Sequence, residues 1–191
     1  MLFRSENFLN QRLLSRDPKF EGKVPVHQWL YEPGIPASAP KFTSDAFVAV
    51  DEVAAQWAKG DAPQTKGRTK DWSTQQWLRF LTHLPEKMPG SRLASLDGTF
   101  GFTKSGNAEI TTEWLKTAIR NEYHAADKRA EEYMVAVGRR KLVRPLYAEM
   151  LNTEAGKKRS AAIYAKARPG YHPILTTTVD DMLTKAGVKL P

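Results

Sequence analysis

The apolar residues of this chain recur at helical spacing, and this spacing constrains the fold more than any other feature of the sequence. The apolar positions of a helix face repeat every three or four residues, whereas those of a half-buried strand alternate every two. No segment here keeps a strand-like alternation for long. One helical stripe runs over residues 42–57, and its apolar members are Phe42, Ala46, Phe47, Val50, Val53, Ala54 and Trp57. The pattern predicts an all-α fold.

Proline and glycine divide the chain into short helices. Gly60, Pro85, Gly98, Gly138 and Gly187 each follow an apolar stripe, at places where helices commonly end. Short helices joined by short turns form antiparallel pairs. We therefore expect stacked antiparallel helix pairs in two layers, an armadillo/HEAT-like α-superhelix. No sequence repeat of fixed period accompanies the pattern.

Two of the predicted helix starts carry side chains that can cap free backbone N–H groups. Ser73 and Gln76 have the spacing of a capping box, in which each side chain bonds the other residue's backbone. Asn107 is placed to accept hydrogen bonds from the first N–H groups of the next helix. Residues 61–71 are polar and contain glycine, so they are predicted to form a solvent-exposed loop.

The first forty residues are organised differently from the rest of the chain. Residues 1–16 are compatible with a helix, and Pro18 closes that region. Four prolines lie between residues 25 and 40, which excludes one continuous helix there. We expect an extended linker whose aromatic residues, such as Trp29 and Tyr31, pack on the domain that follows.

The composition indicates a globular protein with a basic surface. The 191 residues include 29 Lys and Arg against 21 Asp and Glu, a formal net charge of +8. The sequence contains no stretch of about 18 apolar residues, so it predicts no membrane span. The chain contains no cysteine, which excludes disulfides and is compatible with a cytoplasmic location. Positive charge permits nucleic-acid binding, but Trp57, Trp77 and Trp114 lie on apolar helical faces, so we predict core positions and no nucleic-acid partner.

The four histidines, His27, His83, His124 and His172, do not have the spacing of a metal site. None belongs to an H-E-x-x-H motif, and no two lie three or four residues apart with a carboxylate. His83 is predicted to be a half-buried packing residue. His172 directly precedes Pro173 and is predicted to have a capping or structural role. We expect neither catalytic residues nor metal ligands in this chain.

The strongest local signal for binding is a basic turn within residues 138–145. Gly138 is predicted to end one helix, and Pro145 is predicted to lie in the first turn of the next. No acidic residue lies between them, and the basic residues there are Arg139, Arg140, Lys141 and Arg144. Cations beside a helix start form a receptor for an anion such as a carboxylate. A solvated basic turn without a ligand is the alternative interpretation.

Four short motifs follow one another along the chain. They are Trp29-Leu30-Tyr31-x-Pro33-Gly34-Ile35-Pro36, Asn107-x-Glu109-Ile110-x-x-x-Trp114-Leu115, Gly138-Arg139-x-Lys141-x-x-Arg144-Pro145-Leu146 and Tyr171-His172-Pro173-Ile174. In this order and approximate spacing they resemble the C-terminal domain of the leukotriene A(4) hydrolase family of zinc aminopeptidases. The resemblance covers roughly residues 20–187.

This resemblance implies an enzyme of three parts: a β-rich domain, a thermolysin-like catalytic domain that holds the zinc, and an α-helical C-terminal domain that closes one side of the substrate cleft. Residues 23–191 would be the helical domain, and residues 1–22 the end of the preceding domain or a linker. In the family, the G-R-x-K turn binds the substrate's carboxylate end, which by motif match assigns Arg139 and Lys141 to that role. The implied partners are a peptide substrate and the catalytic domain, with the zinc cofactor in that domain and none in this chain.

Two other functions are compatible with the residues. One is a stand-alone helical-repeat adaptor that binds a protein in a groove, and the other is a basic nucleic-acid binder. Residues 1–16 look like the end of a helix from a preceding domain, so we expect a longer parent protein. An in-frame H-E-x-x-H motif with a downstream glutamate, encoded immediately upstream, would favour the aminopeptidase over the adaptor.

Overall fold

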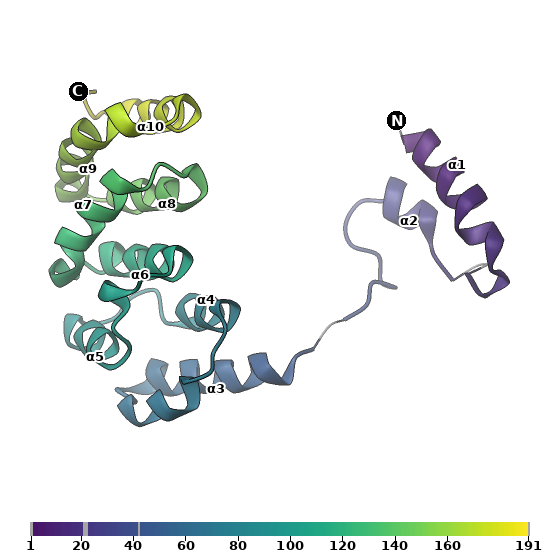
Figure 1. Ribbon diagram of the computed structural model, residues 1–191, viewed down its shortest axis with the longest axis horizontal. Coiled ribbons are helices and arrows are strands. Elements are labelled where there is room, and N and C mark those ends of the chain that lie inside the picture. Colours follow the sequence, from purple (N-terminus) through teal and green to yellow (C-terminus); the bar gives the residue numbers. More distant parts are fainter. Residues whose placement is uncertain (1, 21–22, 42, 191) are drawn as a thin grey trace. The chain divides into compact units, whose positions relative to one another are not determined.

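A computed structural model describes residues 2–20, 23–41 and 43–190 of the chain. The chain forms two compact units, Met1–Thr43 and Ser44–Pro191. Regular secondary structure in the described residues consists of α-helices and short 3₁₀ turns, without a strand (Figure 1). The predicted all-α fold is therefore confirmed. The predicted domain boundary at residue 22 stays a prediction.

The N-terminal unit contains two helices, α1 and α2. They span Leu2–Arg12 and Val26–Tyr31, and single 3₁₀ turns lie at Leu14–Arg16 and Pro18–Phe20. The predicted extended linker is wrong where α2 forms. Pro25 stands just before the first helical residue, a position whose N–H takes no part in the hydrogen bonds of the helix. The helix ends before Pro33.

The side chains of the N-terminal unit form no core of their own. None of those that the structure describes in this unit is buried, and Trp29 is 51% exposed. The Tyr31 hydroxyl donates a hydrogen bond to the Glu6 carboxylate at 2.8 Å. This unit therefore presents apolar side chains to its surroundings, and its most exposed ones are Phe8, Leu13 and Ile35.

The C-terminal unit is a stack of helices in two layers (Figure 1). The layer formed by α4, α6, α8 and α10 has α3 packed against α4, and the other layer contains α5, α7 and α9. The helices are α3 (Asp45–Lys59), α4 (Thr74–His83), α5 (Gly90–Phe100), α6 (Ala108–Arg120), α7 (Asp127–Ala136), α8 (Arg140–Met150), α9 (Glu154–Ala167) and α10 (Pro173–Lys185). This arrangement confirms the predicted stack of helix pairs. No helix of the described part is long and apolar enough to cross a membrane.

Helices α6 and α8, neighbours within one layer, run in the same direction. Lys141 near the start of α8 pairs with Glu109 near the start of α6. Glu149 near the end of α8 pairs with Arg120 at the end of α6. The start of α4 joins the same edge, because the Asn107 side chain before α6 donates to Thr74, the first residue of α4, at 3.0 Å. One edge of this layer therefore collects the N-terminal ends of its helices.

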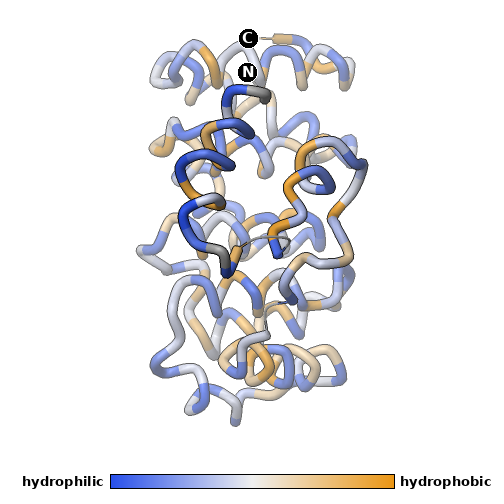
Figure 2. The backbone as a smooth tube through the Cα atoms, turned by 90° about the vertical axis from the view of Figure 1, so that its right-hand side faces the viewer, coloured by the Kyte–Doolittle hydropathy of each residue, from blue (hydrophilic) through white to orange (hydrophobic). Residues whose placement is uncertain are grey.

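One apolar core runs through the C-terminal unit. Apolar (orange) and polar (blue) residues alternate along the helices in Figure 2, as expected of amphipathic helices that bury one face. Val50, Val53 and Trp57 of the predicted stripe are fully buried, whereas Phe42 lies outside the described residues. Trp114 is fully buried, as predicted. Trp77 is only partly buried and packs on the core edge against the rings of Trp72, Phe80, Phe100 and Phe102.

Two predicted boundaries are corrected by the structure. The predicted loop at residues 61–71 contains a 3₁₀ helix at Pro63–Thr69 whose Thr65 is buried, because the Thr65 hydroxyl accepts the indole N–H of Trp57 at 3.0 Å. Helix α5 continues through Gly98 to Phe100. It ends at Gly101, whose φ of 71° lies in the left-handed region that favours glycine.

The predicted caps are confirmed. Ser73 and Gln76 form a capping box at the start of α4. The Asn107 side chain accepts hydrogen bonds from the N–H groups of Glu109 and Ile110. These caps fix where α4 and α6 begin, and so they fix the edge on which Glu109 stands.

Candidate functional site

The basic segment at the start of α8 is positioned by buried residues on the opposite side of the helix. Leu142, Val143 and Leu146 are buried in the core. Because these side chains face inward, the basic residues before and among them face outward. They are Arg139, Arg140, Lys141 and Arg144, all exposed.

The helix starts earlier than proline and glycine predict. Helix α8 begins at Arg140, so Pro145 lies inside the helix and not in its first turn. Buried side chains before and after Pro145 stabilise the helix on both sides of the proline. The tendency of proline to interrupt helices does not take this burial into account. Gly138 is not a helix cap, because α7 ends at Ala136 with Val137 in the capping position. Arg139 is the N-cap residue of α8, with φ −85° and ψ 115°, and its side chain makes no capping bond.

The basic side chains go to different places. The Lys141 ammonium donates to a carboxylate oxygen of Glu109 on α6 at 2.9 Å. The Arg140 guanidinium donates instead to the hydroxyl of Thr178 on α10 at 3.0 Å. Within the described part of the chain, the Arg139 and Arg144 side chains make neither a hydrogen bond nor an ion pair. Arg140 is thus drawn away from the edge that Lys141 shares with α6.

The Glu109 carboxyl is bonded to Lys141 and is also influenced by the charge of Arg139. The hydrogen bond from Lys141 lowers the pKa of the Glu109 carboxyl below its ordinary value, and the charge of Arg139 lowers that pKa further. The carboxylate of Glu109 therefore lies within the field of both cations. The free N–H groups at the start of α8 add partial positive charge at the same edge.

Sequence reasoning missed Glu109 as a member of this site. Glu109 belongs to the Asn107-x-Glu109-Ile110 motif, and its place two residues after a helix cap was visible in the sequence. Its pairing with Lys141 depends on the parallel course of α6 and α8, and the two residues are separated by 32 positions. The signal available in the sequence was that Glu109 and Lys141 carry opposite charges and are each the second residue of a helix.

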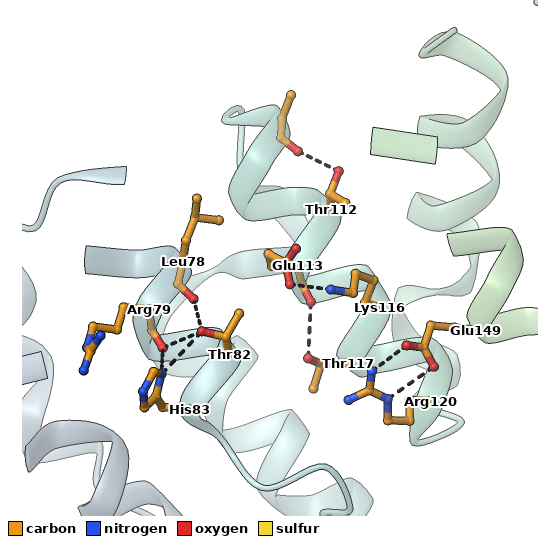
Figure 3. A network of polar contacts seen from close by, with 11 residues as sticks. Leu78, Arg79, Thr82, His83, Thr112, Glu113, Lys116, Thr117, Arg120 and Glu149 are labelled. Carbon is orange, nitrogen blue, oxygen red and sulfur yellow. Dashed lines mark hydrogen bonds and ion pairs between the residues drawn. The ribbon is translucent and has the colours of Figure 1, made fainter. Parts of the chain in front are cut away.

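A second row of polar contacts lies further along the same helices (Figure 3). Glu113 accepts from Lys116 at 2.8 Å, and Arg120 is held by Glu149. Lys87, which with Arg120 lines an open pocket of about 550 Å³, donates to the Arg120 carbonyl at 3.0 Å. Arg120 is paired with Glu149 and Lys87 is bonded to a backbone carbonyl, whereas the Arg139 side chain makes no bond within the described residues. The edge at Arg139 and Lys141 is therefore the better candidate for binding an anion.

Comparison with known proteins places the chain in a family. The family model described as "Leukotriene A4 hydrolase, C-terminal" matches residues 72–183, which include α4 to α9 and nearly all of α10. The chain belongs to this family. The match contains the starts of α6 and α8, and so it includes the edge formed by Arg139, Lys141 and Glu109.

The curated relatives of the chain are longer than the chain itself. "Leukotriene A-4 hydrolase" of Xenopus laevis is 25% identical over 158 residues, covering 80% of this chain and 26% of that protein. "Leucine aminopeptidase 2" of Phaeosphaeria nodorum is 24% identical over 179 residues, covering 87% and 28%. The chain thus spans about a quarter of the length of the curated relatives that it matches.

Two solved structures share the fold of the chain. Native yeast LTA4 hydrolase matches with a TM-score of 0.74 at 22% identity, covering 93% of this chain and 32% of that chain. The yeast LTA4 hydrolase complex with bestatin matches with a TM-score of 0.76 at 23% identity, with the same coverage.

Two of the histidines, His172 and His83, lie at the ends of helices. His172 caps α10, since its Nδ1 accepts the N–H of Ile174 at 3.2 Å, which confirms the predicted capping role. His83 lies on the last turn of α4 with its side chain 44% exposed, 3.9 Å from the carboxylate of Asp51. Within the described ranges, no three His, Asp or Glu residues are grouped so that they could hold a metal ion.

Proposed function

We propose that this chain is the non-catalytic C-terminal domain of a zinc aminopeptidase, and that Arg139 and Lys141 bind the C-terminal carboxylate of the peptide substrate. The observation that carries the proposal is the carboxylate of Glu109, which already lies in the field of both cations. An edge that attracts one carboxylate of the chain has the charge to attract a second from a peptide.

Arg139 and Lys141 would contact the substrate carboxylate in different ways. The guanidinium of Arg139 offers a planar fork that matches both oxygens of a carboxylate, whereas the Lys141 ammonium acts as a point charge. Holding the far end of a peptide fixes where its other end lies, which reduces the entropy lost when the scissile bond is aligned. In this proposal the domain closes one side of the substrate cleft.

The rest of the enzyme belongs to the proposed parent protein. The names of the relatives, leukotriene hydrolase and leucine aminopeptidase, support a peptide substrate and a catalytic domain as partners. The zinc would be held by that catalytic domain, since the described part of this chain offers no ligand cluster. We assign residues 23–191 to the helical domain and residues 1–22 to the end of the preceding domain or a linker. A cytoplasmic location stays a prediction.

Replacing Arg139 with alanine tests the carboxylate assignment. In the full-length enzyme that carries this chain, Arg139→Ala should lower kcat/KM for free-acid peptides about tenfold or more, because charge-assisted hydrogen bonds to the substrate are lost. The loss should be much smaller for peptides with an amidated C-terminus, which have no carboxylate for Arg139 to bind. Steady-state kinetics on matched acid and amide pairs measures this difference.

Arg140→Ala is the matched control for Arg139→Ala. The two arginines are adjacent and exposed, but Arg140 is bonded to Thr178 on another helix, so its removal should change kcat/KM little. Equal losses for acid and amide peptides in Arg139→Ala would show that this side chain supports structure and does not bind the carboxylate.

A second prediction concerns the chain by itself. Because no H-E-x-x-H motif is present in the sequence, the purified 191-residue chain should retain no stoichiometric zinc after dialysis and should cleave no aminoacyl reporter substrate when zinc is added. Metal analysis and a chromogenic aminopeptidase assay measure the two quantities. One tightly bound zinc per chain together with turnover would contradict the non-catalytic assignment.

An adaptor function is the second candidate, and the exposed apolar side chains of the N-terminal unit favour it. Phe8, Leu13 and Ile35 are all more than half exposed, as expected of a surface that binds another protein. The DNA upstream of this chain separates the two functions. An in-frame H-E-x-x-H motif with a downstream glutamate would support the aminopeptidase.

A further inference from the structure

Glu109 contributes a negative charge to the edge that we assign to the substrate carboxylate. Its side chain is 35% exposed, and its partner Lys141 is 67% exposed, so both groups are accessible to a ligand. Two cations and one carboxylate leave one net positive charge among Arg139, Lys141 and Glu109. That charge is sufficient for one carboxylate and not for two.

We propose that Glu109 is a specificity-determining residue, which makes the carboxylate site accept peptides with an uncharged or basic last residue and disfavour peptides with an acidic one. This inference rests on the proposed function of Arg139 and Lys141. An acidic last residue brings two carboxylates to the site, its main-chain one and its side-chain one. The first binds the cations, and the second meets the like charge of Glu109.

The contacts of Glu109 keep this charge in place. The hydrogen bond from Lys141 at 2.9 Å holds the carboxylate beside the cations. The same bond lowers the pKa of Glu109, so the carboxylate remains ionised at neutral pH. Specificity of this kind comes from a repulsive group built against the wrong ligand, in addition to the attractive groups for the right one.

Arg140 does not cancel the effect of Glu109. The Arg140 guanidinium is bonded to Thr178 on α10, whereas Glu109 stands on α6 on the other side of α8. Arg144, one helical turn after Arg140 on α8, is the cation that would oppose Glu109 if a second carboxylate reached it. Repulsion by Glu109 predicts that the wild-type chain disfavours acidic peptides, whereas attraction by Arg144 would make it favour them.

A titration of the isotope-labelled 191-residue chain, followed by NMR at low salt and neutral pH, tests the proposal. The probes are N-acetyl-Gly-Ala, N-acetyl-Gly-Asp and the C-terminal amide of the first. The wild-type chain should bind the alanine acid more tightly than its amide, and the aspartate peptide no more tightly than the alanine acid. Glu109→Gln should improve the affinity for the aspartate peptide relative to the alanine peptide about fivefold, because one charge repulsion at a few ångströms is removed.

Glutamine keeps the size of Glu109 and an oxygen that accepts from Lys141, so the fold and the lysine position should persist. The matched control is Glu113→Gln, one turn along α6, where the glutamate is also paired with a lysine at 2.8 Å. This control should leave the ratio of the two affinities unchanged. An unchanged ratio in Glu109→Gln, an equal change in Glu113→Gln, or a wild-type preference for the aspartate peptide would overturn the inference alone. No difference between alanine acid and amide in the wild-type chain would instead overturn the proposed function.

Discussion

Replacing Trp114 with alanine should lower the free energy of unfolding by about 3–5 kcal/mol, the range observed for large aromatic residues truncated in cores. Trp114 is fully buried, and its ring packs against Phe102 and Tyr123. Its indole N–H also donates to the Thr103 hydroxyl at 2.9 Å. Alanine removes these contacts and leaves a cavity between α6 and its neighbours. Urea unfolding followed by circular dichroism at 222 nm measures the loss.

Two further substitutions calibrate the result for Trp114. Trp77→Ala should cost less, because Trp77 is only partly buried at the edge of the core. Val48→Ala, at a position 54% exposed on α3, should change the free energy of unfolding by less than about 0.5 kcal/mol. A loss below about 1 kcal/mol in Trp114→Ala would contradict the packing described for α6.

Gly156→Ala should destabilise the fold by about 2–4 kcal/mol, through overpacking and a disturbed helix cap. Gly156 lies in the first turn of α9, where an added Cβ atom would clash with the carbonyl oxygen of Met150 at the end of α8. The added methyl group forces the two helix ends apart. The same displacement weakens the cap at α9, in which the Thr153 hydroxyl accepts the Gly156 N–H at 3.1 Å. Thermal and urea unfolding of the variant measure the effect.

Gly98→Ala is the control with the opposite expected sign. Gly98 lies inside α5, and a Cβ atom there meets nothing within 4 Å. Alanine should stabilise the fold by about 0.5–1 kcal/mol, because it restricts the unfolded chain without a clash. If both glycine variants were equally stable, the close approach of α8 and α9 at Gly156 would be contradicted.

Local signals in the sequence predicted most helices, and long-range contacts explain the errors. The capping box of Ser73 and Gln76 and the cap at Asn107 were correct, because each depends on residues within one turn. The polar stretch at 61–71 predicts a solvent loop, since nothing in it shows that Thr65 meets the indole of Trp57. Pro145 predicts a later start for α8 than the structure has, because proline is a strong local signal and burial is not visible locally.

The candidate site was predictable in part for the same reason. Arg139 and Lys141 lie in one short motif that the sequence presents directly. Arg140 stands between them and carries the same charge, yet only the position of Thr178 on α10 shows that it points elsewhere. The role of Glu109 required the distance between two helices. The motif therefore suggests the two cations, and the fold shows that Glu109 lies beside Lys141.

The stacked arrangement has a consequence for how the molecule opens. Helices α6 and α8 each have neighbours on both sides within their layer, whereas α3 and α10 have one on a single side. In a stack held by nearest neighbours, fraying starts at the end members, and the central members exchange their amide hydrogens last. Glu109 and Lys141 stand on α6 and α8, and Arg139 is the N-cap residue of α8, so all three belong to inner helices of the stack. Local unfolding at either end of the stack therefore leaves their mutual geometry intact, so that the site survives fluctuations that the outer helices do not.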